Sequence, residues 1–187
     1  MKAHQKNGQP TGGRLRLVAA YPRQPDTKAA WSSFEGGLAE ALDLLEEDEY
    51  LVIASKRRNH YVQFACQGHH GMRIEAVSNA YITVPADRLT DAQHEHLAAL
   101  GWDGPQEMAP GRQTAPGAGT QGNFFLDVAV PVQTGQVAEL ACATLRSAYN
   151  VRHPGELAYR AFRSTGRVEI RFPSLRLRRI ERNDEVK

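Results

Sequence analysis

Histidine is the residue type in this 187-residue chain with the strongest capacity to bind a metal. His69 and His70 are adjacent in a polar segment that is typical of a turn, which directs their side chains apart rather than toward one ion. His94 and His96 lie two residues apart in a helical segment, whereas two ligands on one helical face need a spacing of three or four. No H-E-x-x-H sequence is present. We therefore expect no metal and no other cofactor, although a metal-dependent enzyme acting through these histidines remains one alternative.

Nucleophile and phosphate-binding motifs are missing from the sequence as well. There is no G-x-S-x-G motif and no phosphate-binding loop, and Gly117-Ala118-Gly119 lies in a linker without a helix opening after it. Cys66 and Cys142 are far apart in the sequence and stand among apolar neighbours. Such cysteines in a cytosolic protein are most simply buried thiols that pack as small apolar side chains, and a disulfide or a reactive thiol is the alternative. The sequence therefore predicts a protein that is not an enzyme.

Composition favours a globular cytoplasmic protein. Hydrophobic residues make up 41% of the chain and charged residues 24%, which is the range of ordinary globular domains. No apolar run is long enough to span a bilayer, and the N-terminus lacks the pattern of a signal peptide. We therefore expect no membrane span and a cytoplasmic location.

Charge is distributed unevenly along the chain. Residues 1–28 carry six basic and one acidic side chain, residues 29–159 carry eight and sixteen, and residues 160–187 carry nine and four. The basic ends either lie against the acidic body or attract an anionic partner such as nucleic acid or a membrane surface.

Periodicity predicts the elements of the first half of the chain. Apolar residues three or four positions apart, beginning at Trp31 and Phe34, predict a helix over residues 31–47. Gly36 and Gly37 weaken that helix but allow another backbone to approach it closely. Three alternating segments follow between residues 50 and 77, and their short connections predict an antiparallel meander, because a parallel pair needs a crossover of about a dozen residues or more.

The second half of the chain contains further helix and strand patterns. Thr90 and Gln93 form a capping box that predicts a helix over residues 90–100. A strand pattern over residues 124–130 precedes a helix pattern over residues 135–149. Pro154 suits the start of a short helix. That helix contains Leu157, Tyr159 and Phe162, and a strand-like alternation follows at residues 168–172 and resumes after Pro173.

The order of these elements between residues 50 and 102 resembles the YbjN-like proteins, which share a superfamily with type III secretion chaperones. The likeness rests on the run Glu75-Ala76-Val77-Ser78-Asn79 and on the terminal Leu100-Gly101-Trp102, and it covers residues 30–165. It implies an α+β fold in which an antiparallel β-meander sheet is covered on one face by α-helices. It also implies a non-enzymatic protein- or peptide-binding module, chaperone-like or an adaptor, whose partner is another polypeptide or a second copy of itself as a homodimer.

The sequence thus divides into a basic N-terminal arm (1–28), a chaperone-like domain (29–165) with a Gly/Pro-rich linker at 104–122, and an arginine-rich C-terminal strand and tail (166–187). Candidate peptide-binding residues, each of which core packing also explains, are Trp31, Phe34, Gly36, Gly37 and Tyr61. Candidates for an anionic partner are Arg167, Arg171, Arg176, Arg178 and Arg179.

A nucleic-acid-binding accessory protein is the main alternative function. Arginines interleaved with aromatic residues near the C-terminus suit phosphate contact and base stacking. No helix-turn-helix, zinc-finger or ribonucleoprotein motif accompanies them. An edge strand whose arginines deter sheet aggregation explains the same composition.

Overall fold

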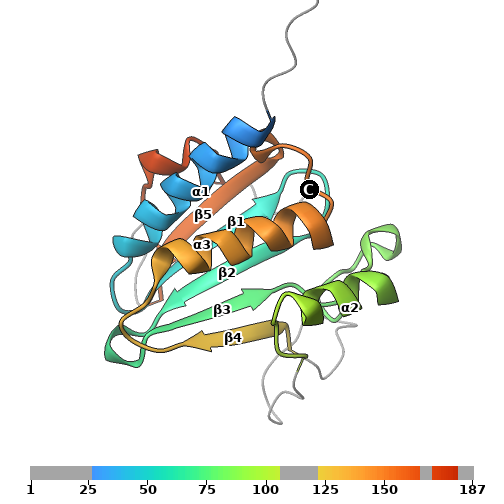
Figure 1. Ribbon diagram of the computed structural model, residues 1–187, viewed down its shortest axis with the longest axis horizontal. Coiled ribbons are helices and arrows are strands. Elements are labelled where there is room, and N and C mark those ends of the chain that lie inside the picture. The colour runs from blue at the N-terminus through green and yellow to red at the C-terminus, as the bar shows by residue number, and fades with distance from the viewer. Residues whose placement is uncertain (1–26, 106–121, 165–169, 181–187) are drawn as a thin grey trace, which may run out of the picture.

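Six strands form one sheet in the computed structural model, which describes residues 27–105, 122–164 and 170–180 (Figure 1). The strand order is β4-β3-β2-β1-β5-β6. Every neighbouring pair is antiparallel except β5 and β6, which are parallel. The strands are β1 (Glu49–Ser55), β2 (Tyr61–Cys66), β3 (Met72–Ala76), β4 (Phe124–Val128), β5 (Leu157–Arg163) and β6 (Arg178–Arg179). The antiparallel meander that the short connections predict is confirmed as β1, β2 and β3.

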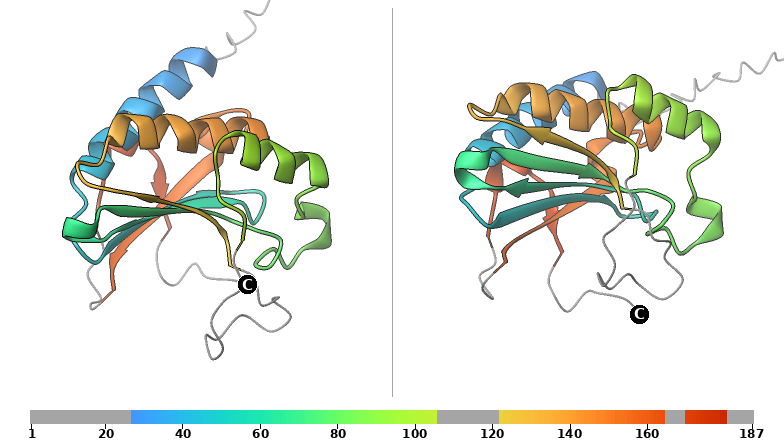
Figure 2. Two further views of the ribbon diagram at one scale, coloured as in Figure 1. Left: turned by 60° about the horizontal axis from the view of Figure 1, so that its bottom comes forward. Right: turned by 90° about the horizontal axis from the view of Figure 1, so that it is seen from below.

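Three helices lie on one face of this sheet (Figure 2). The helices α1 and α3 lie side by side over the central strands, and α2 lies over the β3–β4 side (Figure 1). Their bounds are α1 (Thr27–Asp43), α2 (Asp91–Ala99) and α3 (Thr134–Ala143), and a π-helical segment (Thr144–Ala148) continues α3. The predicted α+β fold, with helices covering one sheet face, is therefore confirmed. None of these described helices combines the length and apolarity that crossing a bilayer requires.

Alternation along each strand places the core between the sheet and the helices. The register aligns Leu51 with Phe64 and with Ala161, and all three side chains are buried. Successive residues of a strand point to opposite faces. Val52 and its cross-strand partners Gln63 and Arg160 therefore lie on the other face, which no described helix covers. Burial of the inward row supplies the main driving force for folding.

The helix α2 begins and ends as its sequence predicts. The side chain of Thr90 accepts a hydrogen bond from the backbone N–H of Gln93, and the Gln93 side chain accepts one from the N–H of Thr90. Gly101 has a φ of 95°, and the N–H of Trp102 donates to the carbonyl of Leu97 at 3.1 Å. This is the left-handed termination that glycine permits. It turns Trp102 back over the helix end, where its indole is buried.

The prediction of a short helix containing Leu157, Tyr159 and Phe162 is wrong. Only Pro154–Glu156 forms a helical turn, of the 3-10 type, and the following residues form β5 beside the central strand β1. Leu157 and Tyr159 point into the core, whereas Phe162 lies on the opposite face and stacks on Tyr50 with ring centroids 5.3 Å apart. Tertiary pairing with β1 therefore overrides the local preference of this segment.

The strand expected at residues 168–172 is also absent where the structure describes it. Residues 170–172 are extended without forming a strand, and a 3-10 turn, η5 (Pro173–Leu175), follows. Only the two residues of β6 pair with β5. The proline supplies no backbone N–H for a sheet ladder, so the chain turns at that point instead.

A close contact between α1 and η5 explains the second glycine of the pair in α1. A Cβ atom built on Gly37 would lie 2.2 Å from the carbonyl oxygen of Ser174, whereas one on Gly36 would meet nothing within 4 Å. The Ser174 hydroxyl donates to the carbonyl of Gly37 at 3.0 Å. The expected close backbone approach is therefore present, and it requires glycine at only one of the two positions.

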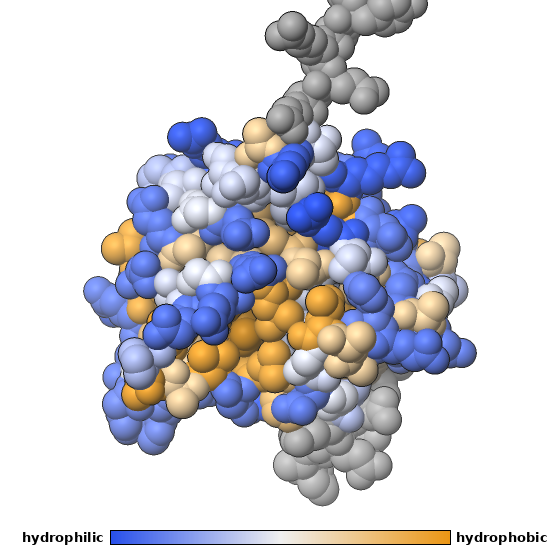
Figure 3. All heavy atoms as spheres, in the orientation of Figure 1, coloured by the Kyte–Doolittle hydropathy of each residue, from blue (hydrophilic) through white to orange (hydrophobic). Residues whose placement is uncertain are grey.

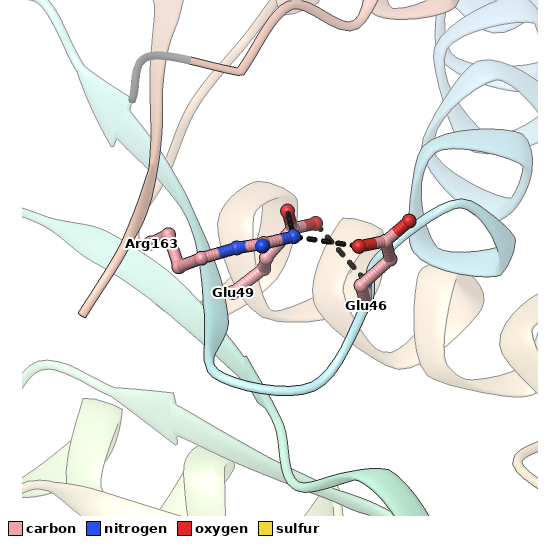
Figure 4. Close-up of polar contacts among 3 residues, drawn as sticks. All are labelled: Glu46, Glu49 and Arg163. Atoms are coloured by element: carbon pink, nitrogen blue, oxygen red, sulfur yellow. Dashed lines mark hydrogen bonds and ion pairs between the residues drawn. The ribbon is translucent and has the colours of Figure 1, made fainter. Parts of the chain in front are cut away.

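The acidic run after α1 is held by an arginine from β5 (Figure 4). One Nη2 atom of Arg163 donates to Glu46 at 2.6 Å and to Glu49 at 2.8 Å. Glu49 in turn accepts the backbone N–H of Glu46 at 3.0 Å. These two hydrogen bonds raise the pKa of Arg163 above its usual value. The arginine thus compensates the carboxylates that follow the negative end of α1.

Several predictions concern residues outside the described ranges. These are the N-terminal arm up to residue 26, most of the 104–122 linker, and the two ends of the 166–187 segment, including Arg167. The division into arm, domain and tail stays a prediction.

Candidate functional site

The residues of α1 that the sequence offers for peptide binding point inward. Trp31 is 3% exposed and Phe34 4%, and their rings meet edge to face with centroids 5.8 Å apart. The indole N–H of Trp31 donates to the backbone carbonyl of Arg152 at 3.2 Å. Gly37 contacts η5, while Gly36 is exposed. Trp31, Phe34 and Gly37 have a packing role in the fold, whereas Gly36 has none, and a peptide-binding role for the four stays a prediction.

Tyr61 lies on the opposite face of the sheet from α1. It is half-buried in β2, and its hydroxyl accepts a hydrogen bond from the amide of Asn123 at 3.2 Å. Burial raises the pKa of the Tyr61 hydroxyl, and the Asn123 hydrogen bond partly offsets that rise. The structure therefore separates Tyr61 from the four residues of α1 with which it was grouped.

The histidines do not form one cluster. The rings of His69 and His70 lie together, with centroids 3.7 Å apart, so the expectation that they diverge is wrong. His94 lies near the Asn79 amide at 3.3 Å, and His96 lies 2.7 Å from the Ser147 hydroxyl. Within the described residues, no three His, Cys, Asp or Glu side chains are grouped so that they could hold a metal ion.

The two cysteines are unpaired and differ in exposure. Cys142, a residue of α3, is buried, whereas Cys66 is half-buried at the end of β2. Burial raises the pKa of the Cys142 thiol to about 12, so this thiol stays protonated and unreactive at neutral pH.

The C-terminal arginines follow the edge of the sheet beside β5. Arg171, Arg176 and Arg178 are exposed, and Arg179 is half-buried in β6. Arg176 adopts a left-handed backbone conformation with a φ of 50°, which ends η5. An anionic partner for these residues stays a prediction.

An apolar surface lies on the helix side of the sheet near β4. The register places Leu126 and Val128 opposite Ile74 and Met72, on the face that carries the core. Both side chains are only half-buried. Val132, on the connection from β4 to α3, and Leu140, on α3, are also half-buried and pack against the core. We call this set the β4 patch: Leu126, Val128, Val132 and Leu140. Figure 3 shows hydrophobic side chains gathered on this face, below α3 and over β3 and β4.

The strand β4 is also an edge of the sheet among the described residues, and these residues pair with only part of its outer backbone. The N–H and C=O of Phe125 bond to Asp103 at 3.2 Å and 3.0 Å. Backbone groups two residues apart point the same way in a strand, so those of Asp127 face the same outer edge. The patch and this edge are adjacent on β4 and together offer apolar contact and backbone hydrogen bonding.

The uncovered sheet face is more polar. Gln63 donates to Glu75 at 3.0 Å, and Arg73 lies 3.7 Å from Asp127. The guanidinium of Arg73 also lies 4.5 Å from the centroid of the Phe125 ring. These side chains pair with one another, and Tyr50 and Phe162 stack elsewhere on the same face.

An extended peptide can add a strand to the edge of a sheet and place alternate side chains on apolar surface beside that edge. The family model described as T3SS (YopN, CesT) and YbjN peptide-binding chaperone 3 matches residues 24–163. The chain belongs to this family, which confirms the resemblance to YbjN-like and secretion-chaperone-like proteins. No curated protein and no solved structure gives a significant match.

The β4 patch is the part of this surface that reading the sequence did not single out. The alternation of Phe124, Leu126, Val128 and Val130 against Phe125, Asp127 and Ala129 correctly indicated a strand. Which inward positions a helix leaves uncovered depends on the placement of α2 and α3, and no local pattern encodes it.

Proposed function

We propose that this protein is a non-enzymatic module that binds an extended segment of another polypeptide, as a chaperone-like or adaptor protein. The observation that carries the proposal is the match of a peptide-binding chaperone family over residues 24–163. The β4 patch and the adjacent strand edge support it, because apolar contact and unpaired backbone groups are what an extended peptide requires.

In the proposed binding mode the peptide adds to the outer edge of β4. Its backbone bonds to the N–H and C=O of Asp127, and alternate side chains contact Leu126 and Leu140 on the helix side. Main-chain hydrogen bonds then supply affinity, and the apolar patch supplies selection among sequences. The bridge from Asp103 to Phe125 limits where the peptide can begin.

Selection from a random peptide library with the full chain tests the proposal. The selected peptide is labelled and titrated by fluorescence anisotropy. We expect Leu126→Gln to raise the Kd about tenfold or more, because burying a leucine side chain contributes about 1.5–3 kcal/mol. The matched control is Val52→Gln, a half-buried position on the uncovered face of the same sheet, which leaves the Kd unchanged.

Hydrogen exchange on the unmodified protein gives a second readout that needs no variant. Bound peptide slows exchange of the β4 amides, Asp127 among them, and leaves the β6 edge unchanged. Protection around Trp31 and Gly36 instead would move the binding site to α1. Recovery of no binding peptide, with the pure protein forming a stable dimer by sedimentation, would contradict the proposal and favour self-association.

A further inference from the structure

A cavity of about 1220 Å³ opens at the end of the molecule away from the β4 patch. Its walls come from four separate segments: the first turns of α1, the turn between β1 and β2, the segment from the end of α3 to Arg152, and the turn before β5. Trp31 lies in one wall, and Arg146 holds its guanidinium 5.6 Å from the centroid of the Trp31 ring. The fold therefore builds this cavity from residues as far apart in the sequence as Thr27 and Glu156.

Basic side chains are concentrated in this cavity. Residues 29–159 carry eight basic side chains against sixteen acidic ones, and four of those eight line the cavity. These four are Arg57, Arg58, Arg146 and Arg152. The single acidic residue of the lining is Glu156, whose carboxylate already accepts the backbone N–H of His153 at 3.2 Å.

The four cavity arginines have no acidic partner among the described residues. Arg163 shows the contrast, because it bonds to two carboxylates at the far end of β5. Guanidinium groups that share a cavity repel one another, and a bound anion relieves that repulsion. The planar fork of arginine also matches a carboxylate with two parallel hydrogen bonds.

Charge on the rest of the body decides which anion fits. The sixteen acidic side chains of residues 29–159 repel a long polyanion or an anionic surface that would extend beyond the cavity. A compact anionic group held inside the cavity avoids that repulsion. A short run of carboxylates on a peptide meets this requirement, and a peptide is also the partner in the proposed function.

We propose that this cavity binds a short acidic segment of the partner polypeptide, with its carboxylates on Arg57, Arg58, Arg146 and Arg152. The assignment rests on the proposed function, and it adds a second contact to the one at β4. The partner would then carry an apolar stretch for the β4 patch and an acidic stretch for the cavity.

A labelled hexaglutamate peptide tests the assignment with the full chain, by anisotropy at about 50 mM salt, where charge screening is weak. We expect Arg146→Gln/Arg152→Gln to raise the Kd at least tenfold, because it removes two of the four guanidinium groups that would hold the carboxylates. Arg73→Gln/Arg88→Gln is the matched control, because it removes the same charge from positions outside the cavity. Hexaglutamine is the neutral control peptide.

Three results would overturn the assignment: an unchanged Kd in the cavity variant, an equal loss in the control variant, or equal binding of hexaglutamine. Tighter binding of duplex DNA or pyrophosphate than of hexaglutamate, lost in the same cavity variant, would also overturn it in favour of that ligand. If a library peptide binds at β4 while hexaglutamate does not bind, the acidic-segment assignment alone fails. If no library peptide binds, the proposed function fails.

Discussion

The two sides of the sheet differ in how far other segments of the chain pair with their outer strands. At the opposite side of the sheet from β4, the backbone N–H of Ile180 donates to the carbonyl of Tyr159 at 2.7 Å, and that of Ile170 donates to the carbonyl of Ala161 at 3.3 Å. The C-terminal segment, which includes β6, therefore covers β5. At the β4 edge, Asp103 forms the only outer bridge within the part of the chain that the structure describes. An uncovered strand edge is a template for pairing with another chain. The difference therefore marks β4 as the edge at which a partner is expected to join.

Side chains repeat this contrast. Phe172, in the covering segment, is 3% exposed, whereas Leu126 of β4 is half-buried. The first completes the core, and the second retains apolar surface that a partner can still bury. The contrast predicts that substitutions at one edge reduce stability and that those at the other reduce binding.

The largest expected effect on stability comes from a substitution in the segment that covers β5. Phe172→Ala lowers the free energy of unfolding by about 3–5 kcal/mol, because it leaves a cavity in the core. Leu126→Ala lowers it by only about 1 kcal/mol, because little apolar area is lost from a half-buried position. Urea denaturation measures both. Equal losses for the two variants would show that the edges do not differ as described.

The contact between α1 and η5 gives an intermediate effect. Gly37→Ala lowers the free energy of unfolding by about 1–3 kcal/mol, because its new methyl group overlaps the backbone of Ser174. Gly36→Ala raises it by about 0.5–1 kcal/mol, because alanine favours the helix and meets nothing at that position. Denaturation curves compare the two variants. A loss at both positions would show that the covering segment approaches α1 differently.

The smallest expected effect concerns the hydrogen bond between Tyr149, which follows the π-helical segment, and Val77, which follows β3. Tyr149 is buried and donates its hydroxyl to the carbonyl of Val77 at 3.0 Å. Burial raises the pKa of Tyr149 well above 10.0. The folded state therefore keeps a proton that the unfolded chain loses near pH 10, so this contribution to stability is complete below pH 10 and is lost as the pH rises further.

Unfolding measured between about pH 8 and pH 11 tests this prediction. Tyr149→Phe weakens the alkaline loss of stability, and it costs about 1 kcal/mol at neutral pH through the missing hydrogen bond. Tyr61, whose pKa burial also raises, keeps part of the alkaline dependence in the variant. An unchanged pH profile would show that Tyr149 does not contribute.

Local patterns predicted most of the fold. The capping box at Thr90 and the alternation of β1 to β3 involve neighbours in sequence, so they can be read directly. Residues 157–163 could not, because Ala161 is a small inward residue and Phe162 an outward aromatic, which hides the alternation of β5. Only pairing with β1, about a hundred residues earlier, identifies that segment as a strand.

The candidate sites were less predictable than the fold. The large aromatic residues of α1 attracted attention, yet Trp31 and Phe34 are needed in the core. The arginines of the cavity were overlooked because Arg57 and Arg58 belong to a turn, while Arg146 and Arg152 lie near the end of α3. Each pair is unremarkable by itself, and only the tertiary fold brings the pairs together.

The pairing of β1 with β5 also sets an order for assembly during synthesis. Residues 49–76 leave the ribosome as a complete meander, but β1 gains its second neighbour only when residues 157–163 emerge. Until then the nascent sheet has two unpaired margins, since β4 is also made late. Long-range pairing of this kind slows folding and exposes intermediates to aggregation. We therefore expect the chain to be most prone to aggregation before residues 157–163 have emerged.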